Sequence, residues 1–259
     1  QLILIVLLCY LVPTVLLGQY MGGVFFADLR QKTETALTSS AEHACTLSLQ
    51  NIRKALDLAK DATYDGELAS VYGSYRSGEI IPAEFLRLSR NYIERKYSRE
   101  ELFTFALFIP AEEGDMLAYN RAGYENAMLF QKQFSETLPE LAQELDTRCL
   151  FVESEGSMYL IRNLMDLKLE RFGTLVLGIN QEMMLGDVRR LAETWDGDVL
   201  LMLGQSGSVE LPWDAMQPGL SEAGDADWIT YVAREKDRDF DFGLLLGVRQ
   251  KRLYGEIFA

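Results

Sequence analysis

The N-terminal stretch LILIVLLCYLVPTVLLG, which spans Leu2–Gly18, sets the organisation of this 259-residue chain. Its apolar run continues to Phe26, and no charged residue occurs before Asp28. A helix needs roughly 20 apolar residues to cross a bilayer, and such a helix tolerates a proline. The sequence therefore predicts a transmembrane helix over residues 1–27, with the rest of the chain outside the cytoplasm.

A secretory signal peptide is the alternative interpretation of the same stretch. The apolar region of a signal peptide has about 7–15 residues, whereas this run is longer and lacks a clear small-x-small cleavage site. Both interpretations place the remaining residues outside the cytoplasm. The chain begins at Gln1 and ends in the pattern GEIFA, so we interpret it as a fragment with further sequence after Ala259.

A long helix is predicted directly after the apolar stretch. Residues 28–63 contain no glycine or proline, and a helix of that length would extend about 54 Å. Small and apolar residues recur there at steps of three and four, the period of one helix face: Leu37, Ala41, Cys45, Leu49, Ile52, Leu56 and Ala59. Such a stripe favours helix–helix packing, within the chain or with a second subunit, and we predict a homodimer through this helix.

Strand patterns follow a lead-in that mixes turn signals with a helical segment, Ala83–Tyr97. LFTFALFIP, Leu102–Pro110, is an aromatic-rich buried strand, and FGTLVLGIN, Phe172–Asn180, is apolar enough for a central strand. The remaining elements are predicted as strands at Met116–Arg121, Cys149–Glu153 and Ser157–Asp166, and as a helical segment over Phe130–Leu145. We expect residues 102–180 to form one antiparallel, PAS-like sheet packed on the long helix.

A smaller set of elements comes next. Gln181–Thr194 has the period of a helix, and strands are predicted at Asp198–Leu203, Trp228–Arg234 and Phe240–Val248, with a loop over 212–227. Long helices followed by runs of strands are typical of the α+β class. The predicted domains are a transmembrane helix (1–27), a long helix with a helical lead-in (28–101), a membrane-distal PAS-like domain (102–180), a smaller membrane-proximal PAS-like domain (181–249) and the start of an exit helix (250–259).

The composition is that of a folded, acidic chain. Apolar residues make up 48% of it, charged residues 25%, and the net charge is −14. Phosphate binding needs a basic face, so this charge excludes nucleic acid as a partner and argues against broad docking on anionic lipid.

No motif of enzyme chemistry is present. The sequence has no glycine-rich phosphate loop and no GxSxG, HExxH or CxxC pattern, so we predict no catalytic residue, no metal site and no cofactor. The single histidine, His43, lies in the long helix and is interpreted as an exposed side chain. The three cysteines form no disulfide framework: Cys9 lies in the apolar stretch, and a bridge between Cys45 and Cys149 stays open.

Polar side chains in and near the apolar strands are the candidate ligand-binding residues. They are Tyr119, Arg121, Tyr124, Tyr159, Arg162 and Asp166. An arginine offers a planar fork that fits a carboxylate or a phosphate, and tyrosines suit a sugar equally well. Tyr159 and Arg162 are three residues apart, so a regular strand would place them on opposite faces unless a bulge intervenes. The alternative role of Arg162 is structural, as an ion-pair partner of Asp166 or another acid.

Three stretches of the chain resemble the extracytoplasmic double Cache sensor of bacterial membrane histidine kinases. They are LIVLLCYLVP at Leu4–Pro13, the segment from YLIRNLMD (Tyr159–Asp166) to FGTLVLGIN (Phe172–Asn180), and FGLLLGVRQKRLYGEI at Phe242–Ile257. The resemblance covers nearly the whole chain, and it is greatest to the group common in Gram-positive bacteria whose regulators control sugar and nutrient genes. It implies two PAS-like domains, a small-molecule ligand such as a sugar or a carboxylate, and a kinase domain beyond Ala259.

One departure from the resemblance concerns the ligand. Amino-acid-binding Cache domains resemble each other in a set of Tyr, Arg, Trp and Asp residues, and this chain has no tryptophan before Trp195. A sugar, another metabolite, a partner protein or no direct ligand therefore stay open. Chemotaxis receptors and cyclic-dinucleotide enzymes resemble the same arrangement outside the membrane. A membrane-anchored adaptor, which should have a closed distal domain, and a tethered hydrolase are the alternative functions.

Overall fold

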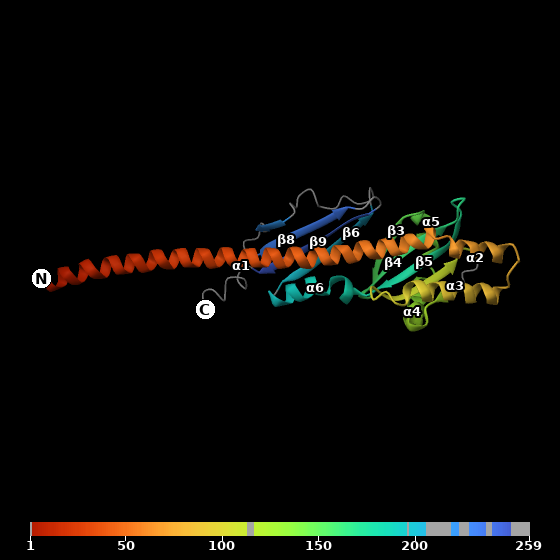
Figure 1. Ribbon diagram of the computed structural model, residues 1–259, viewed down its shortest axis with the longest axis horizontal. Helices are drawn as coiled ribbons and strands as arrows, with labels where there is room; N and C mark the ends of the chain where they lie inside the picture. Colours follow the sequence, from red (N-terminus) through yellow and green to blue (C-terminus); the bar gives the residue numbers. More distant parts are fainter. Residues whose placement is uncertain are drawn as a thin grey trace.

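A computed structural model describes the backbone of residues 2–112, 117–195, 197–205, 219–222, 228–236 and 240–249. One helix, α1 (Leu2–Tyr64), forms a rod, and two antiparallel sheets lie along the part of it that is remote from the N-terminus (Figure 1). The five-stranded sheet, here called the distal sheet, is the farther one, and the four-stranded proximal sheet is nearer the N-terminus. The predicted α+β class is confirmed. The predicted exit helix, 250–259, lies outside the described residues.

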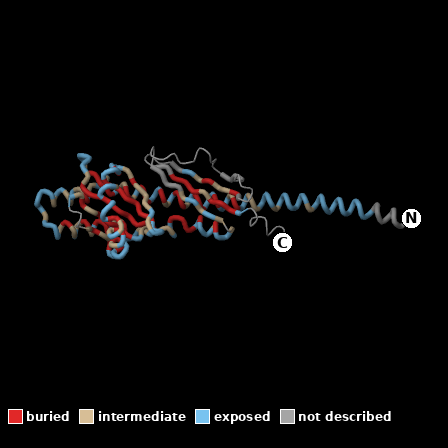
Figure 2. The backbone as a smooth tube through the Cα atoms, turned by 180° about the vertical axis from the view of Figure 1, so that it is seen from behind, coloured by how far each residue is buried: buried red, intermediate tan, exposed pale blue. Residues whose placement is uncertain are grey.

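The described residues of the N-terminal part of α1 are mostly exposed, as the pale blue stretch in Figure 2 shows. Many of them are apolar: Tyr10, Leu17 and Phe25, for example, are 79%, 63% and 59% exposed. By length and composition α1 is able to cross a membrane, and none of its apolar window is buried in the protein. Apolar surface of this kind is unfavourable in water, so the segment needs an apolar environment.

The later part of α1 is a buried spine. The stripe expected from the sequence is at most 6% exposed: Leu37, Ala41, Cys45, Leu49, Ile52, Leu56 and Ala59. It packs against a helix and both sheets of its own chain. The expectation that this stripe forms a dimer interface is therefore wrong for these residues, because a narrow stripe of small residues suits packing on a sheet as well as on a second helix.

The distal sheet has the strand order β2-β1-β5-β4-β3. Its strands are β1 (Phe103–Pro110), β2 (Ala118–Tyr119), β3 (Cys149–Ser154), β4 (Ser157–Met165) and β5 (Arg171–Ile179). Phe108 on β1 pairs with Leu175 on β5, so the two aromatic and apolar strands predicted to share a sheet are neighbours in it.

Helices cover both faces of the distal sheet. They are α2 (Glu67–Arg76), α3 (Pro82–Tyr97), α4 (Tyr124–Phe134) and α5 (Leu138–Leu145), with a 3-10 turn, η1 (Arg121–Gly123). Side chains alternate between the faces of a strand. Phe108 and Leu160 consequently belong to the core on the α1 and α3 side, whereas Phe105 and Tyr159 belong to a separate core under α4 and α5.

The proximal sheet has the strand order β6-β9-β8-β7. Its strands are β6 (Asp198–Gln205), β7 (Gly219–Glu222), β8 (Trp228–Lys236) and β9 (Phe240–Arg249), and α6 (Gln181–Thr194) runs beside α1 before them. β7 lies within the stretch 212–227, which the sequence predicts as a loop. It is an edge strand of four residues, GLSE, too short to show an alternating pattern.

The two cysteines outside the apolar stretch form no disulfide. Cys45 on α1 and Cys149 on β3 are both buried, and no bridge joins them. Burial raises the pKa of the Cys45 thiol to about 12. Cys45 is therefore a neutral member of the core at physiological pH, as expected for a small apolar residue of the spine.

The burial of the spine predicts that substitutions at two positions of α1 change the free energy of unfolding by different amounts. Ile52→Ala should lower the free energy of unfolding by about 2–5 kcal/mol, because it removes buried methyl groups and leaves a cavity. Asp57→Ala, at an exposed position of the same helix, should change it by less than about 0.5 kcal/mol. Chemical denaturation of the purified chain measures both. Equal, small effects would contradict the packing of α1 on the sheets.

Candidate ligand-binding site

A cavity of about 460 Å³ lies under α4, on the face of the distal sheet away from α1. Cavities that hold small molecules have roughly 300–1,000 Å³, so its size fits a small metabolite. We call it the distal pocket. Its walls come from β1, β4, α4, the β3–β4 turn and the start of α6, and include Phe105, Asn126, Leu129, Gln133, Glu155 and Tyr159.

Hydrogen bonds organise the polar side of the distal pocket. The Tyr159 hydroxyl donates to Gln133 Oε1 at 3.4 Å, and Gln133 Nε2 donates to Glu155 Oε2 at 2.6 Å. Gln181 Nε2, at the start of α6, donates to the carbonyl oxygen of Gly156 at 2.9 Å. Among the polar groups that line the cavity, the Tyr159 hydroxyl, the Gln133 and Gln181 amides and the Glu155 carboxylate are therefore each held by a partner on another element.

The Phe105 and Tyr159 rings line the distal pocket, and further aromatic rings of the core pack behind them. The Tyr159 ring lies 4.9 Å from the Phe130 ring, 5.7 Å from Phe134 and 6.0 Å from Phe105, measured between ring centroids. α4 approaches β1 closely at its start, where a Cβ on Gly123 would come within 2.2 Å of the Phe105 Cβ. Glycine at 123 is thus what lets the helix cover the sheet and close the cavity from above.

The structure separates the six residues that the sequence singles out. Tyr159 alone among them lines the distal pocket. Tyr119 and Tyr124 pack on each other with ring centroids 5.2 Å apart, and the Arg90 guanidinium lies 4.9 Å from the Tyr119 ring. The Arg121 side chain is exposed, and its backbone N–H donates to Glu94 Oε2 at 3.0 Å. These three residues lie beside the start of α4, outside the cavity.

Arg162 lies on the opposite face of the sheet from Tyr159. The register of β4 is regular from Tyr159 to Arg162, so no bulge brings the two side chains together. Arg162 is 5% exposed, donates from Nη1 to Cys149 Sγ at 3.3 Å, and has no hydrogen-bond partner at Nε. Its position indicates a core residue on the α1 side.

Asp166 also has a local role. Its Oδ1 accepts hydrogen bonds from the backbone N–H groups of Lys168 and Glu170, at 2.8 and 2.9 Å, in the turn between β4 and β5. The carboxylate therefore shapes a turn. Arg162 and Asp166 thus bond to other groups, and the expected ion pair between them is wrong. The burial of Arg162 still supports a structural role for that residue.

Four residues of the distal pocket were not predicted from the sequence: Asn126, Leu129, Gln133 and Glu155. The helical segment predicted there begins at Phe130, whereas α4 begins at Tyr124. A signal was available, because the buried positions Ala127, Phe130 and Phe134 recur at three and four residues. That spacing indicates a helix with one face packed on a core. The neighbouring positions of such a helix then lie at the edge of the core, where they can line a pocket.

Comparison with known proteins identifies the fold. No protein-family model and no curated protein sequence matches the chain. The periplasmic sensory domain of the Campylobacter jejuni chemoreceptor Tlp1 is similar in structure, with 10% identity, 87% of this chain and 98% of that chain covered, and a TM-score of 0.51. The chain has the fold of a chemoreceptor sensory domain.

Further solved structures are similar over most of the chain. The sensory domain of the Campylobacter jejuni chemoreceptor Tlp3 has 7% identity and a TM-score of 0.50, with 88% and 98% of the two chains covered. The ligand-binding domain of the Pseudomonas aeruginosa amino-acid chemoreceptor PctC, solved with GABA, has 13% identity and a TM-score of 0.47, with 82% and 99% covered. The likeness to the Tlp1 and Tlp3 sensory domains confirms the predicted Cache-like fold.

Arg162 generates a test that separates a structural from a ligand-binding role. A buried charge without a carboxylate partner is often replaced by an apolar side chain of similar size at no cost, so Arg162→Met should keep or raise the free energy of unfolding. Arg162→Ala should lower it by about 2 kcal/mol or more, because it leaves a cavity. Thermal and chemical denaturation measure both. A Met variant as unstable as the Ala variant would show that the charge itself is needed.

Proposed function

We propose that this chain is the extracytoplasmic sensing region of a bacterial transmembrane signalling receptor. The observation that carries the proposal is the continuity of α1, a 63-residue helix that runs from the exposed apolar stretch to the end of the distal sheet. The fold shared with chemoreceptor sensory domains supports it. In this proposal the apolar stretch is a membrane anchor, and the two sheets lie outside the cytoplasm.

We infer that a small molecule binds in the distal pocket. Tyr159, Gln133 and Asn126 supply hydroxyl and amide groups, and Glu155 supplies one carboxylate. No arginine or lysine is among the described residues of the lining, so the pocket favours a hydroxyl-rich or amine-bearing molecule over a phosphate. The adaptor alternative expects a closed distal domain, and a cavity of this size speaks for a ligand.

Signalling would follow from a difference in affinity. A ligand shifts a conformational equilibrium only if it binds one state better than the other. α1 packs on the distal sheet, on α6 and on the proximal sheet, so a change in the distal domain would reach the membrane through one helix. We propose a two-component histidine kinase as the output and a homodimer that pairs through the exposed part of α1 before Leu37.

Ligand binding in the distal pocket is tested by filling its mouth. Leu129 lines the pocket and is 56% exposed, so Leu129→Trp should block the cavity without disturbing the core. Metabolites are first screened by thermal shift on the purified chain, and each hit is titrated by calorimetry. We expect at least a tenfold loss of affinity in Leu129→Trp, equivalent to about 1.4 kcal/mol.

The matched control is Leu167→Trp, at a fully exposed position in the β4–β5 turn. It adds the same side chain outside the pocket and should leave the affinity unchanged. A metabolite that binds Leu129→Trp as well as the unmodified chain would place the ligand elsewhere.

The homodimer is tested by cross-linking in membranes. Gln31→Cys and Thr35→Cys, at exposed positions of α1 before the spine, should each form a disulfide-linked dimer in a Cys9→Ser background. Leu167→Cys, in the β4–β5 turn, should give little cross-linked product. If neither α1 position cross-links more than Leu167→Cys does, the chain does not pair through this part of the helix.

A further inference from the structure

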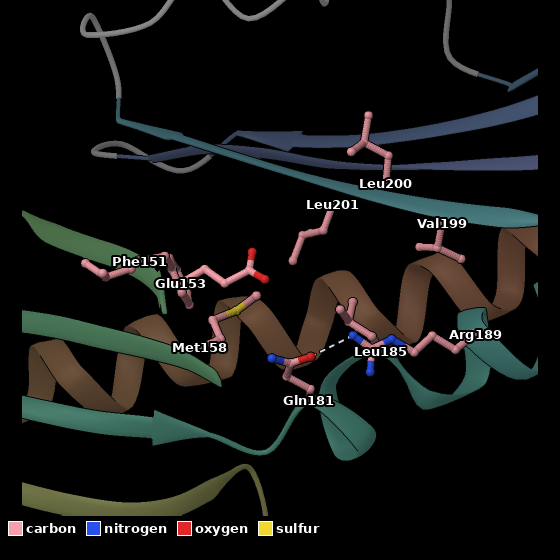
Figure 3. A pocket seen from close by; sticks show the side chains of 10 residues that line it. Phe151, Glu153, Met158, Gln181, Leu185, Arg189, Val199, Leu200 and Leu201 are labelled. Atoms are coloured by element: carbon pink, nitrogen blue, oxygen red, sulfur yellow. Dashed lines mark hydrogen bonds between the residues drawn. The ribbon is translucent and has the colours of Figure 1, made fainter. Parts of the chain in front are cut away.

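A second cleft, of about 400 Å³, lies where the two sheets meet (Figure 3). We call it the interdomain cleft. Its apolar walls come from the distal sheet, the helix α6 and the proximal sheet. The residues are Phe151, Val152 and Met158 on β3 and β4, Leu185 on α6, and Val199 and Leu201 on β6. A molecule bound there would touch the distal sheet, the connecting helix and the proximal sheet at once.

Arg189 gives the interdomain cleft its chemical character. It donates from Nη2 to Gln181 Oε1 at 2.7 Å, an amide that carries no charge (Figure 3). Gln181 is itself held at its other end by Gly156. The guanidinium is thus positioned by a neutral group, which leaves its charge and most of its five N–H donors for another partner.

The neighbouring arginine shows the contrast. Arg190 donates to Glu182 at 3.1 Å and to Asp187 at 2.7 Å, so two carboxylates balance its charge. Among the residues that the structure describes, no carboxylate lies within ion-pair distance of Arg189. The chain as a whole is acidic, with a net charge of −14, yet Arg189 lies at a cleft with only an amide as its partner. Such an arginine is suited to bind an anion from outside the chain.

Glu153 limits which anion fits. Its carboxylate points into the same cleft from β3, opposite α6 (Figure 3). One anionic group at Arg189 is favoured, whereas a second anionic group at the Glu153 end would meet a like charge. Between the two ends, Leu185 and Leu201 offer apolar surface for the body of the molecule.

We propose that the interdomain cleft binds an organic monoanion with an apolar body, such as an aromatic or short aliphatic monocarboxylate, with Arg189 as the ligand of its carboxylate. Arg189 and Glu153 line this cleft and not the distal pocket, although Gln181 and Met158 line both cavities. Binding rests on the geometry of the cleft alone, and an effect on signalling rests in addition on the proposed function. That effect would arise because α6, which carries Arg189, is tied to α1 by the hydrogen bond from Asn51 Nδ2 to the Met183 carbonyl oxygen, 2.9 Å long.

The test uses phenylacetate and the straight-chain monocarboxylates from butanoate to octanoate, titrated by calorimetry into the full chain in amphipol. We expect at least one to bind, and its neutral amide to bind at least tenfold more weakly. Arg189→Gln should weaken the acid at least tenfold. Arg190→Gln makes the same change of charge at the adjacent position, outside the cleft, and should leave the affinity unchanged.

Two further variants sharpen the outcome. Glu153→Gln should lower the ratio of the affinity for hexanoate to the affinity for adipate, the dianion whose second carboxylate lies at the far end of the same six-carbon chain. Leu129→Trp, which closes the distal pocket, should leave binding of the acid unchanged. The proposal is overturned if none of the acids binds, if Arg189→Gln binds them as well as Arg190→Gln does, or if Leu129→Trp abolishes binding. A distal pocket that fails its own test leaves this result unaffected, so the two failures are distinguishable.

Discussion

The burial of one face of α1 is the constraint on which the rest of the structure depends. A single helix supplies core residues to both sheets: Cys45 lies in the same core as residues of the proximal sheet, and Ile52 and Leu56 lie in the core that continues onto the distal sheet. Neither sheet covers its inner face without this helix. Because a helix is stiff along its axis, the two domains share one rigid element, and that element continues into the exposed apolar stretch.

The same constraint explains what the sequence could predict. Periodicity identified the long helix, and aromatic or apolar runs identified β1 and β5, because each of these elements buries a continuous stripe or face. The helix α6 has the predicted bounds, Gln181–Thr194, since it begins at an N-cap whose side chain accepts from Met183 N–H. Each of these features depends on a short stretch of chain, so the local sequence pattern is enough to predict it.

What the sequence could not predict depends on contacts between distant residues. A stripe of small residues on α1 is compatible with a second subunit or with a sheet, and only the tertiary structure shows that Ile52 is covered by its own chain. Arg162 is chemically suited to a carboxylate, but its place on a regular strand turns it toward Cys149 and away from the pocket. The distal pocket itself exists because α4 lies close to β1 at Gly123, a contact between segments far apart in the sequence.

The start of α6 is the place where the two cavities meet. Gln181 and Met158 line both the distal pocket and the interdomain cleft. The two ends of the Gln181 amide make hydrogen bonds at different cavities. Its nitrogen donates to the Gly156 carbonyl oxygen beside the distal pocket, and its oxygen accepts from Arg189 in the cleft. A ligand carboxylate that engages Arg189 competes with that oxygen, and a distal ligand that displaces the Gly156 contact frees the other end of the same side chain. If both proposed ligands bind, occupancy of one cavity would alter the groups that the other offers, and such a coupling would be reciprocal. Since α6 packs along α1, the shared end of the two cavities would be linked to the one helix that continues toward the N-terminus.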